Sequence, residues 1–176
     1  CNHPWLNVIM KKIAFATSDE KLAVSKESGD WLYGKLPYTI MNNAIDLNRY
    51  SFNEANRKEI RGKYGLENEI VIGNEARFTS EKNHLFLLET FLELVSIFPN
   101  IKLLLLGDGP KLEEMKKVVM NRKIDKNVIF VGRVSNPEIY YSAMDLFMFP
   151  SKYESLGLVL IEAQANGLKC IASTNM

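Results

Sequence analysis

The chain has 176 residues, which is enough for one domain of good size with some length to spare. Its net charge of +1 argues against nucleic acid or an anionic membrane surface as a general partner, so any positive site must be local. With 47% hydrophobic and 24% charged residues it has the composition of an ordinary globular protein, and no apolar run reaches the length of a membrane span.

The cysteines and histidines do not have the spacing of a metal site. Cys1 and Cys170 are far apart, as are His3 and His84, and Cys170 lies in an apolar run typical of a core thiol. We therefore expect no metal, and, because no signal-peptide pattern opens the chain, a cytoplasmic location. The chain stops at Met176 directly after a strand-like segment, which indicates a fragment of a longer protein.

The first quarter of the chain contains short predicted elements. Residues 11–17 predict a strand, and residues 25–33 predict a short helix that ends at Gly34. Residues 37–41 are expected to be extended, and residues 42–46 have turn chemistry.

From residue 56 onward, predicted helices and strands alternate. Helices are predicted at residues 56–64, 83–98, 110–122 and 137–143 and from about residue 156. Strands are predicted at residues 70–76, 101–106, 128–131, 145–149 and 169–172. Five strands separated by helices predict an α/β fold with a doubly wound parallel sheet.

Ligands of such a sheet bind beyond the carboxyl ends of its strands, so the loops there are the expected place for a site. Arg77 and Lys82 are the cations of the first such loop. A guanidinium fork and an ammonium are suited to clamp a diphosphate, although exposed loop cations are more often merely solvated. The loops at this edge are residues 77–82, 107–110, 132–136 and 151–157.

Glu154 and Glu162 are eight residues apart across a predicted boundary between loop and helix. A helix that begins near Leu156 would hold the two carboxylates on the order of 8–12 Å apart. The free N–H groups of the helix start favour an anion such as phosphate. Glu162 has apolar neighbours, so it is expected to be partly buried and to need a polar partner, such as a ligand hydroxyl. The pair suits a nucleotide-sugar, but similar pairs occur on ordinary surface helices.

The turn at residues 107–110, Gly-Asp-Gly-Pro, begins like a dinucleotide-binding fingerprint but lacks the third glycine. A tight turn that allows close backbone approach is the better interpretation. Arg133 is placed either to lie near a base or phosphate or to cap a loop. Asp145, at the start of a strand, is expected to be a hydrogen-bonding structural residue.

Several stretches together resemble the C-terminal, donor-binding domain of retaining GT-B glycosyltransferases of family 4, of the type that assembles bacterial capsular or exopolysaccharide. The resemblance runs from about residue 24 to residue 173, and its most specific part is the Glu-x7-Glu segment. The stretches are residues 42–46, Arg77 with residues 81–83, residues 106–110, residues 128–133, and residues 149–151 through 162–163.

In such enzymes the positions of Arg77 and Lys82 bind the donor diphosphate, that of Glu154 contacts the transferred sugar, and that of Glu162 contacts the ribose. Backbone amides of residues 155–157 meet the diphosphate and the sugar, and the loop at residues 132–134 lies close to the base. The resemblance therefore implies the catalytic residues Arg77, Lys82 and Glu154. The implied donor-binding residues are these three with Gly107, Arg133, Val134, Ser155, Leu156, Gly157 and Glu162.

The sequence departs from the family pattern at two glycines, because Ala76 replaces the glycine of the usual Gly-Arg and Ala44 that of the usual Asn-Gly. The resemblance implies that residues 1–41 are the end of an N-terminal acceptor domain and a linker. Residues 42–176 would then be the donor-binding domain, truncated at its C-terminus. Without the acceptor pocket, the fragment is expected to bind donor weakly and to transfer sugar poorly or not at all.

The resemblance implies transfer of a hexose, with retention and without a cofactor, from a nucleotide-sugar to a saccharide or lipid-linked acceptor. A UDP-sugar is favoured, and the expected role is surface polysaccharide biosynthesis, compatible with peripheral association of the full-length protein at the inner membrane face. Two other interpretations stay open. A non-catalytic nucleotide-sugar-binding module would bind the donor without transferring it, and a Rossmann oxidoreductase would need the glycine fingerprint that this chain lacks.

Overall fold

The computed structural model describes residues 4–154 and 156–174. The chain forms two compact units, Cys1–Ala44 and Ile45–Met176. The sequence places this division between Met41 and Asn42, and the assignment of the first unit to an acceptor domain stays a prediction.

The first unit contains two helices and two short strands among its described residues: α1 (Pro4–Thr17), β1 (Leu22–Ala23), α2 (Lys26–Tyr33) and β2 (Thr39–Ile40). Strands β1 and β2 pair in parallel. Ser25 begins α2 with a capping box, in which its side chain accepts from the Ser28 amide and the Ser28 side chain accepts from the Ser25 amide. Gly34 ends α2, as the sequence predicts.

The predicted strand at residues 11–17 is wrong, because these residues form the second half of helix α1. They continue an apolar run that begins near Trp5, and the whole helix is 14 residues long, too long for an ordinary strand. Lysine and alanine in residues 11–17 are good helix formers. Short apolar segments of this kind do not distinguish a strand from a helix by periodicity alone, and length decides between them.

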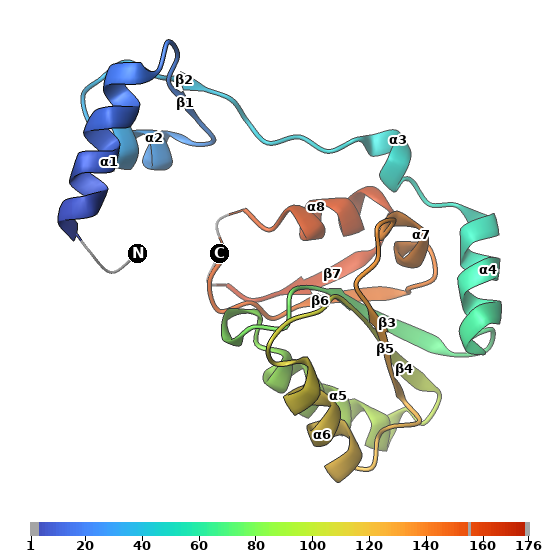
Figure 1. Ribbon diagram of the computed structural model, residues 1–176. Helices are drawn as coiled ribbons and strands as arrows, with labels where there is room; N and C mark the ends of the chain where they lie inside the picture. The colour runs from blue at the N-terminus through green and yellow to red at the C-terminus, as the bar shows by residue number, and fades with distance from the viewer. Residues whose placement is uncertain (1–3, 155, 175–176) are drawn as a thin grey trace. The chain divides into compact units, whose positions relative to one another are not determined.

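The second unit contains a five-stranded parallel sheet with helices on both faces (Figure 1), which confirms the predicted α/β doubly wound fold. The strand order is β5-β4-β3-β6-β7, so β3 is central. The strands are β3 (Ile70–Glu75), β4 (Ile101–Leu106), β5 (Val128–Gly132), β6 (Leu146–Phe149) and β7 (Lys169–Ala172). The helices are α3 (Leu47–Tyr50), α4 (Glu54–Tyr64), α5 (His84–Ile97), α6 (Leu112–Asn121), α7 (Glu138–Tyr141) and α8 (Leu158–Ala165), with the 3-10 turn η1 (Ser80–Lys82).

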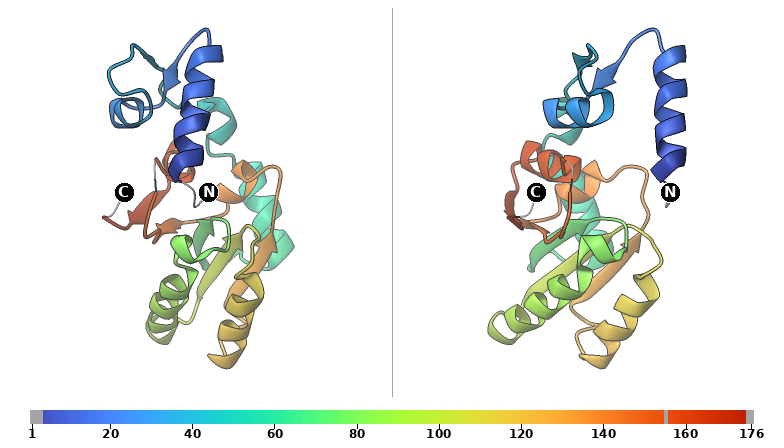
Figure 2. Two further views of the ribbon diagram at one scale, coloured as in Figure 1. Left: turned by 60° about the vertical axis from the view of Figure 1, so that its left-hand side comes forward. Right: turned by 90° about the vertical axis from the view of Figure 1, so that its left-hand side faces the viewer.

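Two apolar clusters cover the two faces of the sheet. One packs helices α5 and α6 on the sheet through residues such as Leu87, Phe91 and Met115. The other packs α4, α7 and α8 on the opposite face through residues such as Tyr141 and Ala163. The two layers of helices can be followed in the rotated views (Figure 2). Strand β4 is buried from Leu103 to Leu106, as expected for a continuous apolar strand between two helix layers.

Two helices of the second unit begin two residues later than the sequence predicts. Helix α8 starts at Leu158 rather than near Leu156, because Gly157 has a left-handed conformation with φ 64° that cannot continue a right-handed helix. Helix α6 starts at Leu112, two residues beyond Pro110. The backbone of the preceding turn is held by hydrogen bonds to Phe78 in the loop after β3, which donates to the Asp108 carbonyl and accepts from the Lys111 amide.

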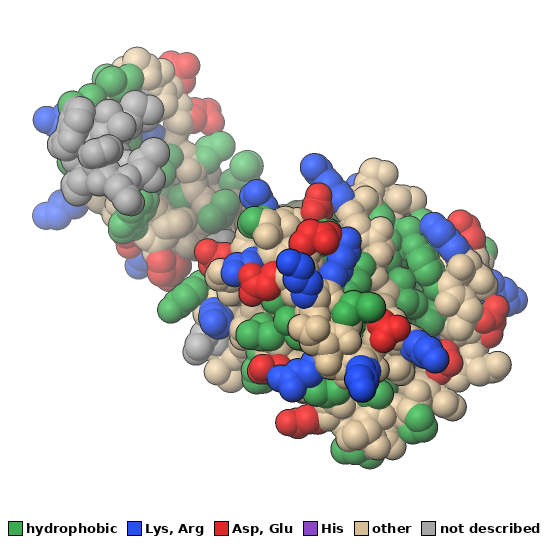
Figure 3. Space-filling view, turned by 60° about the horizontal axis from the view of Figure 1, so that its bottom comes forward, with side chains coloured by type: hydrophobic (Ala, Val, Ile, Leu, Met, Phe, Trp, Pro, Cys, Tyr) green, Lys and Arg blue, Asp and Glu red, His purple; other side chains and the backbone are tan. Residues whose placement is uncertain are grey.

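Basic and acidic side chains are interspersed on the face of the molecule that Figure 3 shows, in agreement with the net charge of +1. In the part of the chain that the structure describes, no helix combines the length and the apolar character needed to cross a bilayer.

Asp145 joins helix α4 to the sheet. Arg57 donates a hydrogen bond of 2.7 Å to one carboxylate oxygen, and Arg61 donates one of 2.6 Å to the other. The Val71 amide adds a hydrogen bond of 2.8 Å. Burial opposes ionisation of Asp145, but these hydrogen bonds and the charge of Arg61 together hold its pKa below the ordinary value. The predicted structural role of Asp145 is confirmed.

Arg61→Met should lower the free energy of unfolding by about 1.5–3 kcal/mol, because it removes a buried guanidinium that donates to the Asp145 carboxylate, which keeps Arg57 as its other partner. Arg61 is 7% exposed, and its side chain also donates to backbone carbonyls of the second unit. Urea unfolding monitored by circular dichroism measures the change. The control is Lys58→Met in the same helix. This lysine is 78% exposed, and its ion pair with Glu54 is long, at 3.9 Å. It should change stability by less than about 0.5 kcal/mol, and equal effects of the two substitutions would contradict the prediction.

Candidate functional site

A cavity of about 630 Å3 lies at the carboxyl ends of β3, β4 and β5. Parallel strands end at the same edge of a sheet, so the loops after β3, β4 and β5 meet there. Residues of α8 and η1 complete the wall. The lining residues are Glu75, Ala76, Arg77, Lys82, Gly107, Asp108, Gly109, Arg133 and Val159.

The floor of the cavity is a close contact between the loops after β3 and β4. The Ala76 amide donates to the Leu106 carbonyl over 3.1 Å, and the Phe78 amide donates to the Asp108 carbonyl over 3.0 Å. Gly107 has φ 125°, and a Cβ atom there would lie 2.1 Å from the Ala76 carbonyl oxygen. The turn at residues 107–110 thus allows the close backbone approach that the sequence predicts. Gly107 makes this approach possible because it has no Cβ atom, and the side chain of Ala76 does not prevent it.

Two arginines of the cavity wall have free charges. Arg77 and Arg133 are exposed, and among the ion pairs of the described residues neither has a carboxylate partner. They come from the loops after β3 and β5, which flank the β4 turn. Two unneutralised guanidinium groups on one cavity provide a binding surface for an anion.

Lys82 lines the same cavity and forms an ion pair with Glu154. Both side chains are largely buried, with 24% and 16% exposure, and the Lys82 ammonium lies 5.5 Å above the centre of the Phe149 ring. The Lys152 amide donates to the Glu81 carbonyl over 2.8 Å, which ties the loop after β6 to η1. These contacts bring together two residues that the sequence separates by 72 positions.

Glu162 lies on α8 and is partly buried, as the sequence predicts. Its polar partner is the hydroxyl of Tyr141, at 3.1 Å, and the same hydroxyl lies 2.5 Å from Glu75 at the end of β3. Glu162 does not line the cavity itself, but Val159, one turn earlier on α8, does. Glu162 is therefore connected to the cavity through Tyr141 and Glu75.

The remaining predicted site residues have different surroundings. Leu156 is 45% exposed, and Gly157 begins α8 without a side-chain cap, which leaves N–H groups of its first turn available. Val134 packs against the core next to the cavity rather than lining it. Ser155 lies outside the described residues.

The sequence did not indicate Glu75, Asp108 or Val159 as parts of the site. Glu75 ends a strand whose other residues are mostly buried, and a carboxylate in such a position is a signal that could have been used. Val159 is indistinguishable in sequence from the core residues of α8. Asp108 caps its own turn by accepting a 2.7 Å hydrogen bond from the Gly109 amide.

Residues 4–154 and 156–174 contain no group of three or more histidine, cysteine, aspartate or glutamate side chains arranged to hold a metal ion. The absence of a metal from the mechanism stays a prediction.

His84 begins α5 next to the site and is 3% exposed. Its ring stacks on Phe78 with centroids 4.0 Å apart, and neither ring nitrogen has a hydrogen-bond partner among the described residues. Burial lowers the pKa of His84 to about 4, and the charge of Lys82 adds to the effect.

The family profile described as "Glycosyl transferases group 1" matches residues 56–176. The chain belongs to this family of glycosyltransferases. The match begins inside α4 and includes every residue of the cavity wall.

Relatives with known names are glycosyltransferases as well. The chain is 30% identical over 175 residues to the putative glycosyltransferase EpsF of Bacillus subtilis, covering 96% of this chain and 46% of that protein. It is 31% identical over 147 residues to the alpha-monoglucosyldiacylglycerol synthase of Streptococcus pneumoniae, covering 80% of this chain and 33% of that one. The chain thus spans from a third to about half of these relatives.

Two solved structures have the same fold. Anabaena Alr3699/HepE in complex with UDP-glucose superimposes with a TM-score of 0.81 at 21% identity, over 96% of this chain and 48% of that one. The C-terminal domain of a group 1 glycosyl transferase from Francisella tularensis superimposes with a TM-score of 0.67 at 23% identity, over 75% of this chain and 71% of that one. At these identities the likeness establishes the fold of the second unit.

Gly107→Ala should lower the free energy of unfolding by about 2 kcal/mol or more, because alanine is strained at this φ and its Cβ would meet the Ala76 carbonyl. The matched control is Gly62→Ala in α4, where an added Cβ meets only Glu67 at 3.9 Å. There the change should stabilise the protein by up to about 1 kcal/mol. Thermal unfolding measures both, and a neutral or stabilising Gly107→Ala would contradict the close contact of the loops.

His84 should make stability fall as the pH falls from 6.5 towards 4. The folded-state pKa is lowered, so in this window the unfolded chain binds a proton that the folded chain excludes, at up to about 1.4 kcal/mol per pH unit. Urea unfolding of wild type and His84→Gln across this window isolates the contribution, because other titrating groups are common to both. Parallel pH profiles for the two proteins would show that the buried imidazole does not titrate as described.

Proposed function

We propose that this chain is the donor-binding part of a retaining GT-B glycosyltransferase of family 4 that uses a nucleotide-sugar, with a UDP-sugar favoured. The observation that carries the proposal is the convergence of Arg77, Lys82 and Arg133 on one cavity beside the uncapped start of α8. Cations together with free helix amides are suited to a diphosphate. Two of these cations have no protein carboxylate to neutralise them in the described part of the chain.

In this proposal Arg77 and Lys82 grip the diphosphate, and the amides around residues 155–157 supply further donors. Lys82 and Glu154, which pair with each other in the structure, would each change partners when the donor binds. When a diphosphate takes the ammonium as its partner, Glu154 gains free acceptor capacity and can orient hydroxyls of the transferred sugar. Arg133 and Val134, in the loop after β5, are assigned to the neighbourhood of the base, and Glu162 is assigned to the ribose.

The chemistry follows from where charge develops. Departure of the nucleoside diphosphate places negative charge on the leaving phosphate oxygens, close to Arg77, Lys82 and the helix start. Fixed cations can stabilise this charge without a metal ion or another cofactor. We infer front-face attack with retention, in which the leaving phosphate oxygen takes the proton of the acceptor hydroxyl. Glu154 is an orienting group in this scheme and forms no covalent bond to the sugar.

The acceptor and the biological role concern the longer protein. We propose a saccharide or lipid-linked acceptor, bound by a domain outside this chain, and a role in surface polysaccharide biosynthesis. The similarity to an alpha-monoglucosyldiacylglycerol synthase supports a lipid-linked acceptor. The chain alone should not complete transfer, and peripheral membrane association and the cytoplasmic location stay predictions for the full-length protein.

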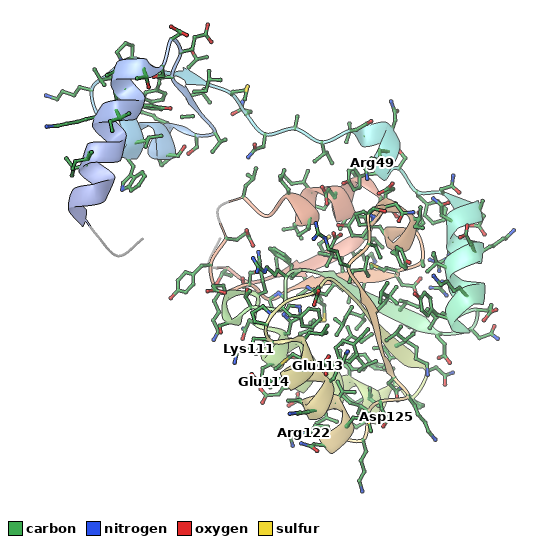
Figure 4. The ribbon with its side chains drawn as sticks, in the orientation of Figure 1. Arg49, Lys111, Glu113, Glu114, Arg122 and Asp125 are labelled. Carbon is green, nitrogen blue, oxygen red and sulfur yellow. The ribbon has the colours of Figure 1, made fainter. Side chains whose placement is uncertain are left out.

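Arg77→Ala and Lys82→Ala should each weaken UDP binding about tenfold or more, the usual loss for a charge-assisted hydrogen bond. Isothermal titration of the chain with UDP and a panel of UDP- and GDP-sugars measures the affinity. Arg122→Ala is the matched control, because Arg122 lies at the end of α6 away from the cavity lining (Figure 4). Affinities for UDP that match wild type in both variants would refute the diphosphate clamp. A full-length protein that binds the donor but never transfers it would instead be a nucleotide-sugar sensor.

A further inference from the structure

Glu75, Tyr141 and Glu162 form a cluster in which two carboxyl groups share one hydroxyl. Glu75 ends β3 and lines the cavity, Tyr141 ends α7, and Glu162 lies on α8. The Tyr141 hydroxyl lies 2.5 Å from the Oε2 atom of Glu75 and 3.1 Å from the Oε2 atom of Glu162. Tyr141 is fully buried, so its hydroxyl has no bulk water as an alternative partner.

The number of protons in the cluster decides how its members bond. A phenol carries one proton and can donate it to only one carboxylate. If both carboxyl groups were ionised, one of them would face an oxygen lone pair at hydrogen-bonding distance. If Glu75 carries a proton, it donates to the Tyr141 oxygen while Tyr141 donates to Glu162. Both contacts are then hydrogen bonds.

The surroundings of Glu75 favour this arrangement. Burial raises the pKa of the Glu75 carboxyl, and the negative charges of Glu162 and Glu138 add to this, while the hydrogen bond from Tyr141 opposes it. Burial, together with Glu75 and then Glu162, also raises the pKa of Tyr141, so the phenol keeps its proton. Among the described ion pairs, Glu75 has none that would hold it ionised.

Glu162 has different surroundings. Arg49 on α3 (Figure 4) forms an ion pair of 3.1 Å with Glu138, and its charge also interacts with Glu162. Burial, together with the neighbouring Glu162 carboxyl, raises the pKa of Tyr50 to about 12. Glu162 thus has a nearby cation and the phenol groups of Tyr141 and Tyr50 in its surroundings.

We propose that Glu75 is a positioning residue of the nucleotide site: it holds the proton of the cluster, so that Tyr141 donates to Glu162 and fixes this carboxylate as the acceptor for the two vicinal hydroxyls of a ribose. The inference rests on the proposed function, which assigns the ribose to Glu162. It adds that recognition of the ribose depends on a carboxyl group whose proton must be present. Binding therefore weakens as the pH rises through the pKa of Glu75, because a second negative charge then competes for the Tyr141 proton.

The test compares UDP with 2′,3′-dideoxy-UDP, which lacks both hydroxyls, in isothermal titrations of the chain. Tyr141→Phe and Glu75→Leu should each weaken UDP binding about tenfold, the loss of one hydrogen bond to a charged group. They should weaken binding of the dideoxy nucleotide much less, since that ligand makes no use of Glu162. A purely structural role would weaken binding of both nucleotides equally and would overturn the inference.

Glu75→Gln separates the proton from the charge, because its amide donates to Tyr141 at every pH. It should recover most of the affinity that Glu75→Leu loses. From pH 4.5, the ordinary value for a glutamate, upward, the affinity of wild type should fall relative to that of Glu75→Gln. Titration of the nucleotide phosphates is common to both proteins and cancels. Parallel pH profiles, or a Glu75→Gln variant as weak as Glu75→Leu, would overturn the inference.

Two controls complete the design. Tyr140→Phe changes the neighbouring tyrosine, whose hydroxyl interacts with Tyr64 and Lys63 rather than with the cluster, and it should leave the ratio of the two affinities unchanged. Glu59→Gln removes an exposed carboxylate of α4 and should leave it unchanged too. If wild type binds neither nucleotide, the proposed function fails. If wild type prefers UDP over its dideoxy analogue, and the Glu75 and Tyr141 variants keep the same ratio of the two affinities, only the present inference fails.

Discussion

The position of strand β3 in the middle of the parallel sheet is the constraint on which the site depends. Because β4 and β6 pair on either side of β3, the loops after these strands leave the same edge of the sheet. The turn at Gly107 therefore lies in close contact with the Ala76 carbonyl, and η1 forms a hydrogen bond with the loop that carries Glu154. The Arg57, Arg61 and Asp145 network holds α4 and the start of β6 in this arrangement.

Charge at this edge is distributed in two ways that have different consequences. Lys82 and Glu154 neutralise each other, so a ligand that binds there exchanges one partner for another. Arg77 and Arg133 have no such partner among the described residues and can meet an anion without first breaking an ion pair. A chain with a net charge of only +1 thus places three cations, Arg77, Lys82 and Arg133, on one cavity whose wall also includes Glu75 and Asp108. This local field, rather than the overall charge, is what suits a diphosphate.

The carboxyl groups at and behind the cavity wall follow a different principle. Glu75 and Glu162 are partly buried and meet at the fully buried Tyr141 hydroxyl, where the number of protons that the three groups share decides which hydrogen bonds form. Arg49 and Tyr50 on α3 interact electrostatically with Glu162, and Glu75 has no corresponding interaction with them. Two carboxyl groups of the same type thereby acquire different surroundings, a pattern that commonly accompanies functional sites.

The sequence by itself determined the parallel α/β sheet, its five strands, and the loops that carry Arg77, Lys82, Gly107, Arg133 and Glu154, because these features are set by local periodicity and turn chemistry. It did not determine that residues 11–17 are helical, since length and context decide that. Only the tertiary structure decided the pairing of Lys82 with Glu154 and the meeting of Glu75 with Glu162 at Tyr141. Such contacts join residues 21 to 72 positions apart, and only chain folding specifies which distant side chains share a buried hydroxyl or charge.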